Sequence, residues 1–411
     1  MLSSIVKSPE STDKSNVEID LNNVVSGGSS NQADAYHATI SGGQMNIASA
    51  SHTTVSGGRQ NSASYFYATI GGGYGNTAIG RDSVIGGGSR NTASDARATV
   101  GGGVQNIASA PDTTIAGGAY NLASDDYASV GGGTRNLAEG FSSTIAGGIG
   151  NNTTADLATI SGGLGNQALA SYATISGGHG NIASGAYASI PGGLLNFARG
   201  DFSVASGRRS QTVEEHPGVF IFADSNDFDF VSETANEFAV RASGGVRFVT
   251  GIDQQGNPLT GVILPQGSGA WSSLSDRNLK ENISPVDGEL ILASLAGIPI
   301  STWNYTGQES SIQHIGPMAQ DFYASFGLGE DNKHISTIDA DGISLAAIQG
   351  LYSIVQEQNA KINSLEAQIK ITIAAFLSCV FMFIFLLLQN IKERISHRKT
   401  TGKVPLIEGD I

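Results

Sequence analysis

The sequence predicts a mainly β protein that begins as a solenoid and ends in helices, the last of which spans a membrane. Three observations carry this prediction. Glycine pairs recur in phase through the first half, apolar residues recur every seven positions after residue 345, and the run from Ile371 to Leu388 carries no charge. We expect a β-roll of 15-residue repeats, a β-rich connector, an α+β module with a coiled coil, and a transmembrane helix, in that order.

Composition and charge exclude several classes of protein. The chain of 411 residues has 55 glycines and only 14% charged residues, which is typical of a repetitive architecture rather than of two ordinary cores. Its net charge of −14 excludes sequence-independent binding to nucleic acid. The single cysteine, Cys379, excludes an intrachain disulfide framework and a cysteine-based metal site. The first residues lack the apolar core of a secretory signal peptide.

The repeat begins at Val25 with VSGG and continues without insertion to IPGG at Ile190, always at a period of 15. An asparagine follows six places after each β-branched residue, from Asn31 to Asn196. A fixed short period predicts a solenoid over residues 23–207, in which each copy forms one coil and valine or isoleucine fills a thin core. The glycine pairs provide the positive φ of tight turns. Twelve coils at ~4.8 Å would span roughly 58 Å.

Three alternative interpretations of the glycine-rich repeat do not fit. A disordered linker needs no isoleucine or asparagine in phase. Phosphate loops and calcium-binding β-rolls need a lysine after the loop or aspartate ligands on a nine-residue period, and neither is present. We therefore expect a structural or adhesive role with no cofactor. The repeats resemble the heads of trimeric adhesins over about residues 20–207, which implies three chains packed together. After the tail of residues 1–22 and this head, alternating apolar residues predict a β connector over 208–270.

The stretch SLSDRNLKENI, residues 273–283, separates the glycine-rich part from the helical part. From residue 271 the chain resembles the endosialidase-type intramolecular chaperone of phage tailspikes and fibres, which also occurs in the myelin regulatory factor. The matching segments are SDRNLKENI at 275–283, HIGPMAQDF at 314–322 and AIQGLYSIVQEQNAKINSLEAQI at 347–369. The resemblance implies a self-cleaving module over 271–345, with Ser275 as nucleophile, Lys280 as base and Leu274–Ser275 as the bond that is cut.

The residues themselves set conditions on this chemistry. A lysine can take the proton of a serine hydroxyl only in its neutral form, which burial favours. Positions five apart share no face of a helix or strand, so Ser275 and Lys280 meet either in an irregular turn or across a subunit boundary. Two alternatives stay open: Ser275 caps a short helix while Lys280 points into water, or His314 and Asp339 form a triad with Ser275.

A seven-residue apolar period predicts a coiled coil over residues 346–370. The seam consists of Ile348, Leu351, Val355, Gln358, Ile362, Leu365 and Ile369. Its β-branched and leucine positions alone favour two strands, so a homotrimer rests on the family resemblance.

The uncharged run predicts a transmembrane helix over residues 371–389, because 18 residues rise roughly 27 Å. A basic tail follows over 390–411, which favours a cytosolic carboxyl end, although insertion as a tail anchor would reverse the orientation.

The sequence thus suggests a membrane-tethered precursor of a homotrimeric fibre that cleaves itself once, with a cell-surface ligand as a further candidate partner. The released head would belong to a virion or a cell surface. The alternatives are an uncleaved, membrane-anchored adhesin or virion fibre, and a soluble effector released from a membrane as in the myelin regulatory factor.

Overall fold

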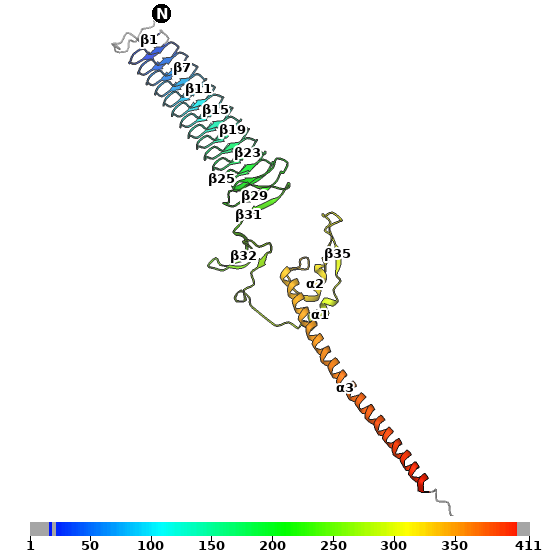
Figure 1. Ribbon diagram of the computed structural model, residues 1–411. Coiled ribbons are helices and arrows are strands. Elements are labelled where there is room, and N and C mark those ends of the chain that lie inside the picture. Colours follow the sequence, from blue (N-terminus) through cyan, green and yellow to red (C-terminus); the bar gives the residue numbers. More distant parts are fainter. Residues whose placement is uncertain (1–15, 19–21, 401–411) are drawn as a thin grey trace, which may run out of the picture. The chain divides into compact units, whose positions relative to one another are not determined.

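The computed structural model describes residues 16–18 and 22–400 and divides into two compact units. The first unit contains the chain up to Arg247 together with Leu264–Trp271. The second contains Phe248–Ile263 and the chain from Ser272 onward. Figure 1 shows the coils of the first unit and the helices of the second.

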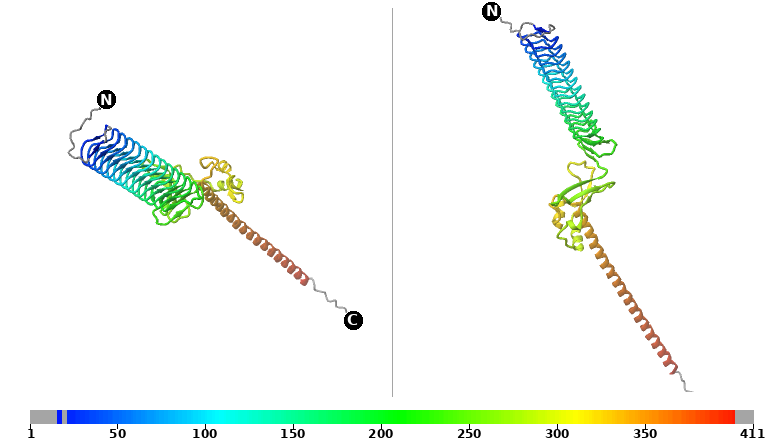
Figure 2. Two further views of the ribbon diagram at one scale, coloured as in Figure 1. Left: turned by 90° about the horizontal axis from the view of Figure 1, so that it is seen from above. Right: turned by 90° about the vertical axis from the view of Figure 1, so that its left-hand side faces the viewer.

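The first unit is a parallel β-solenoid built from two long ladders, and Figure 2 shows the same stack of coils from two other directions. One ladder consists of β1 (Val17–Glu18), β3 (Gln32–Ala33), β5 (Ile47–Ala48), β7 (Ser62–Ala63), β9 (Thr77–Ala78), β11 (Thr92–Ala93), β13 (Ile107–Ala108), β15 (Leu122–Ala123), β17 (Leu137–Ala138), β19 (Asn152–Thr153), β21 (Gln167–Ala168), β23 (Ile182–Ala183), β26 (Phe197–Ala198), β28 (Ser210–Gln211) and β30 (Phe230–Val231). The other consists of β2 (Val24–Val25), β4 (Thr39–Ile40), β6 (Thr54–Val55), β8 (Thr69–Ile70), β10 (Val84–Ile85), β12 (Thr99–Val100), β14 (Thr114–Ile115), β16 (Ser129–Val130), β18 (Thr144–Ile145), β20 (Thr159–Ile160), β22 (Thr174–Ile175), β24 (Ser189–Ile190), β27 (Val204–Arg208), β29 (Phe220–Ala223) and β31 (Phe238–Arg241), with β25 (Gly193–Leu194) paired to β27. The predicted solenoid is confirmed.

Each coil supplies small apolar side chains to a continuous core. In the ladder that starts at β2, the second residue of each two-residue strand is a buried valine or isoleucine, such as Ile115. The other ladder supplies mainly alanines, such as Ala123, which are equally buried. Because the register between neighbouring coils is 15 residues, as in Ile40 with Val55, like side chains stack on like.

The recurring asparagine is buried and holds neighbouring coils together. Asn106 Nδ2 donates to the carbonyls of Gly102 and Gly118, both at 2.9 Å. Its Oδ1 accepts the backbone N–H of Asn121 in the next coil at 3.1 Å. These bonds satisfy the Gly102 carbonyl and the Asn121 N–H, and they add a second donor to the Gly118 carbonyl, which also accepts the backbone N–H of Val104 at 2.9 Å.

Glycine is required at one position of each pair. Gly88 has φ +88, and a Cβ there would lie 2.1 Å from the carbonyl oxygen of Gly103 in the next coil. At Gly87 a Cβ would meet nothing within 4 Å. The expected positive φ at the turns is therefore found, and close stacking of coils adds a second reason for glycine at the last position.

The ladders continue past residue 207, the expected boundary of the repeat head. The sequence period is lost there because the coils lengthen: Val204 pairs with Phe220, and Phe220 pairs with Phe238. Residues 208–241, which we expected in the connector, thus supply β28 to β31 of the two ladders.

The described part of the second unit contains short strands and three α-helices. Most of the sheet of β32 (Gly245–Ile252), β33 (Pro258–Pro265) and β34 (Ser272–Ser273) belongs to this unit, and a 3-10 turn, η1 (Arg277–Leu279), follows it in the chain. Then follow α1 (Gly288–Ala296), the antiparallel pair β35 (Ser301–Trp303) and β36 (His314–Gly316), α2 (Ala319–Phe326) and α3 (Thr337–Thr400). Helix α1 packs so closely on α3 that a Cβ on Gly350 would lie 2.1 Å from the carbonyl oxygen of Gly288.

Helix α3 runs unbroken for 64 residues and is long and apolar enough to cross a membrane. An 18-residue window in it has a mean hydropathy of 2.8 and no buried residue. The seam predicted for a coiled coil lies upstream on the same helix and is also exposed, with Ile348 at 63% and Leu365 at 52%. Two apolar surfaces of α3 are therefore uncovered in the single chain.

Candidate functional site: a serine and a lysine after strand β34

Strand β34 fixes the backbone just before the serine. Ser273 pairs with Val262 of β33 in an antiparallel register. The N–H of Leu274 then donates to the carbonyl of Gly261 at 3.1 Å. The bond between Leu274 and Ser275 therefore follows directly after the sheet. Backbone hydrogen bonds of Ser273 and Leu274 fix its position.

A short turn follows and reverses the chain. The Asp276 carboxylate accepts two hydrogen bonds from Asn278, one from the backbone N–H at 2.9 Å and one from the side-chain amide at 3.1 Å. Asp276 is thereby the N-cap of η1. The N–H of Lys280 donates to the carbonyl of Arg277 at 3.2 Å and ends the turn. Aspartate favours such caps because its side chain replaces a missing backbone acceptor.

This turn brings Ser275 and Lys280 together. Lys280 Nζ donates to Ser275 Oγ at 2.6 Å, within one chain. The single chain thus adopts the irregular turn, one of the two arrangements that the spacing allowed. The cap of the short helix is Asp276 and not Ser275, so the capping role considered for the serine belongs to its neighbour.

Both side chains of the pair are exposed. A base must accept the hydroxyl proton, which a lysine does only as a neutral amine. Burial favours the neutral form of a lysine, so the exposed pair has the distance required for proton transfer but not the buried environment that favours it.

The rival histidine lies in a different setting. His314 is on β36, where it pairs with Trp303, and its Nε2 hydrogen-bonds Gln308 Oε1 at 3.0 Å. Among the hydrogen bonds of the described residues, none joins His314 or Asp339 to Ser275. The geometry therefore favours the serine and lysine pair over the triad.

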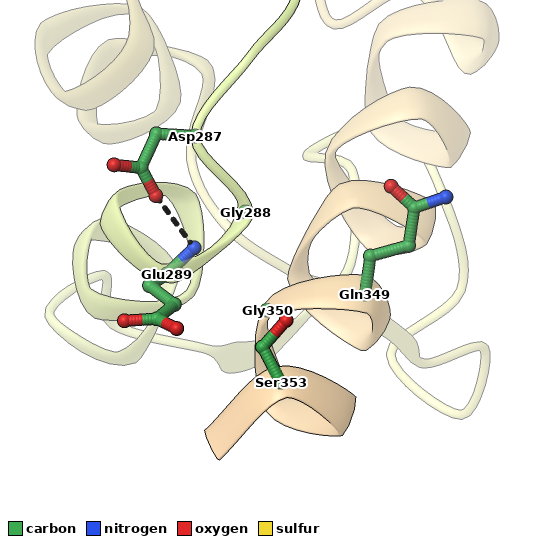
Figure 3. A pocket seen from close by; sticks show the side chains of 6 residues that line it. All are labelled: Asp287, Gly288, Glu289, Gln349, Gly350 and Ser353. Carbon is green, nitrogen blue, oxygen red and sulfur yellow. Dashed lines mark hydrogen bonds between the residues drawn. The ribbon is translucent and has the colours of Figure 1, made fainter. Parts of the chain in front are cut away.

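Two hollows in this unit lie elsewhere. The first, about 420 Å³, is bordered by polar groups of α1 and α3, as Figure 3 shows, and within it Asp287 accepts the N–H of Glu289 at 3.0 Å as the cap of α1. The second, about 590 Å³, lies around Trp303 and Met318. Neither is lined by Ser275 or Lys280. Within the described residues there is also no cluster of three side chains that could hold a metal ion.

The residues that position the pair were not among those predicted from the sequence. Asp276 and Asn278 form the turn, and the carbonyl of Gly261 holds Leu274. An aspartate with a polar residue two places on is a recognisable turn signal, so the role of Asp276 was readable from the sequence. The contribution of Gly261 depends on strand pairing and was not.

Part of the chain matches a known protein family. Residues 275–327 match the family model described as chaperone of endosialidase, and the match begins at Ser275 itself. This supports a role of the segment as an intramolecular chaperone in the assembly of a trimeric fibre. No curated protein matches the chain.

Proposed function

We propose that the chain is the membrane-tethered precursor of a homotrimeric fibre, and that its assembly module cuts the backbone once between Leu274 and Ser275. The observation that carries the proposal is the 2.6 Å contact between Lys280 Nζ and Ser275 Oγ, at the first residue of the family match. The module would comprise residues 271–345 and act with a coiled coil over 346–370.

The reaction is an acyl shift followed by hydrolysis. Lys280 Nζ, once neutral, takes the proton of Ser275 Oγ, and the oxygen attacks the carbonyl carbon of Leu274. The C–N bond breaks, the amine nitrogen of Ser275 takes up a proton from the lysine, and an ester joins Leu274 to Ser275 Oγ. Water then hydrolyses this ester, which frees the carboxylate of Leu274 and restores the hydroxyl. Because the substrate is the adjoining backbone, no separate substrate pocket is needed.

Assembly would control this reaction through burial. In the single chain the side chain of Lys280 is exposed to water and the seam of α3 is uncovered. Association of three chains along the seam removes apolar surface from water, and would cover the pair if neighbouring modules pack over it. Loss of water favours neutral lysine, so the bond is cut only after the trimer has formed. Cleavage then makes assembly kinetically irreversible, because the assembly module can leave while the heads stay associated.

The apolar part of α3 would provide the membrane tether. Its polar side chains are satisfied within the helix: Thr372 Oγ1 donates to the carbonyl of Gln368 at 2.8 Å, and Ser378 Oγ to that of Ala374 at 2.9 Å. Such internal hydrogen bonding is what a hydrocarbon environment demands. The cut would separate the head covalently from this tether.

The test is to express the full chain, purify it in detergent, and measure by mass spectrometry the products of the wild type, Ser275→Ala and Ser273→Ala. We expect pieces of 274 and 137 residues from the wild type and from Ser273→Ala, the control in the adjoining strand. Ser275→Ala should remain intact. An assembled wild-type trimer that stays intact would instead favour the second candidate, an uncleaved adhesin or virion fibre, which the exposure of the pair also permits.

A further inference from the structure

We propose that the base of the solenoid carries a contact surface for a second copy of this chain, which holds the heads together once the bond before Ser275 has been cut. The surface, the phenylalanine patch, consists of Val204, Phe220, Phe222, Phe238 and Val240. The proposal rests on the proposed function in that it assumes a head that must stay oligomeric without α3.

Strand register places these side chains in two adjoining columns. Val204, Phe220 and Phe238 are partners across β27, β29 and β31, and Phe222 is the partner of Val240. Along β29 and β31 these residues alternate with the buried Ile221, Ala223 and Ala239. They therefore all point out of the same sheet face.

The composition of this face changes at the base of the solenoid. Upstream in the same column, the outward residues are mostly threonines, such as Thr144, Thr159 and Thr174, followed by Ser189. At β29 and β31 they become large and apolar, and Phe220, Phe222, Phe238 and Val240 are 41%, 37%, 68% and 37% exposed. The rings of Phe220 and Phe238 stack with centroids 5.2 Å apart. A contiguous exposed apolar surface of this kind indicates a binding surface.

Charge favours an identical copy as the occupant. Two copies of a chain with a net charge of −14 repel each other unless the contacting surfaces are locally neutral. At the carboxyl ends of the patch strands the charged groups are already paired within one chain: Arg208 with Asp227 at 2.8 Å, Arg209 with Asp229 at 2.6 Å, and Arg241 with Asp224 at 3.1 Å. Three arginines and three aspartates leave no net charge among these groups.

The phenylalanine patch lies in the part of the chain that must stay oligomeric after cleavage. The patch lies in the first unit, before residue 274, and would remain with the head. The seam of α3 lies after the cut and would be lost with the assembly module. Once the assembly module has left, the separated heads can associate only through surfaces of the solenoid, and the phenylalanine patch is a contiguous apolar surface that stays with them.

Crosslinking of the full chain tests the proposal. In a Cys379→Ser background, Phe220→Cys places a thiol in the patch, and Val231→Cys places one on β30 in the other ladder at a similar exposure of 44%. A short bis-maleimide, which joins two thiols as thioethers, is added to each variant in detergent. Products are resolved on a denaturing gel, with Ser275→Ala versions in parallel.

We expect interchain products from Phe220→Cys and not from Val231→Cys, both in the cleaved protein and in the Ser275→Ala chain. We also expect Phe220→Ser with Phe238→Ser to turn the cleaved head from an oligomer into a monomer by native mass spectrometry, while Val231→Ser does not. Equal crosslinking at both cysteines, none at Phe220→Cys, or an oligomeric double-serine head would overturn the patch as a contact between copies. A patch that instead binds lipid vesicles would also overturn it. An uncut wild-type chain on the same gel would refute the proposed cleavage, and this result is independent of crosslinking at the patch.

Discussion

The buried asparagine ladder gives the sharpest stability prediction, because one side chain serves two coils. Replacing Asn106 by alanine removes the acceptor of the buried Asn121 N–H and a donor to the half-buried Gly102 carbonyl. The Gly118 carbonyl keeps the N–H of Val104 at 2.9 Å. Leaving a buried donor unpaired costs about 1–3 kcal/mol, and the half-buried carbonyl costs less because water reaches it. We expect a loss of about 2–4 kcal/mol in total.

Hydrogen exchange of the full chain measures this loss where it occurs. A loss of about 2–4 kcal/mol corresponds to amide exchange roughly 30- to 700-fold faster in the coils around residues 100–125. Coils far from this region should change little, because each coil contacts only its neighbours.

Thr114→Ala is the matched control, since Thr114 is exposed on β14 in the same region. It should alter exchange by a factor of about two or less. If Asn106→Ala and Thr114→Ala behaved alike, the asparagine ladder would not contribute to coil stability and the reasoning would be refuted.

Three further predictions address the site, the turns and the base of the solenoid. Lys280→Arg should abolish cleavage, because a guanidinium cannot act as a base, and mass spectrometry should detect only the intact chain. Cleavage of this variant at the wild-type level would exclude Lys280 as the base. Gly88→Ala should lower the melting temperature of the solenoid while Gly87→Ala should not, because only the first places a Cβ against the next coil, and equal melting would contradict the close approach. Hydrogen bonds from Ser243 and Asn226 hold the pKa of Asp224 well below its usual range. This carboxylate stabilises the fold above its unfolded pKa of about 4, and the stabilisation is lost as the pH falls below that value. Exchange around β29–β31, corrected for intrinsic rates, should therefore rise on acidification in the wild type more than in Asp224→Asn, and an equal rise in both would count against the role of Asp224.

The solenoid was predictable because the sequence repeats with a constant period of 15 residues. A β-branched residue, a glycine pair and an asparagine at fixed offsets specify one coil, and repetition specifies the stack. The end of the stack was not predictable, because coils that lengthen toward Phe220 and Phe238 lose the period while keeping the ladder. The hydrogen bonds of Asn106 also required the structure, since the sequence places the asparagine without saying which carbonyls it meets.

The candidate site was predictable in identity and only partly in geometry. Family resemblance singled out Ser275 and Lys280, and their spacing excluded a shared face of a helix or strand. Which of the remaining arrangements holds depended on the turn capped by Asp276, a local feature that spacing alone does not determine. The exposure of the pair was likewise not readable from the sequence, and it is this exposure that links cleavage to assembly in our proposal.

The most direct test of the central claim is to block association without touching the pair. Leu365→Asp places a charge in the apolar seam of α3, whereas Ala367→Asp places the same charge two positions away, outside the seam. For each variant, the oligomeric mass in detergent and the fraction of cut chain are measured on the same sample. We expect Leu365→Asp to be monomeric and uncut, and Ala367→Asp to be trimeric and cut after Leu274. A monomeric Leu365→Asp chain that is nevertheless cut would contradict the claim that assembly completes the site.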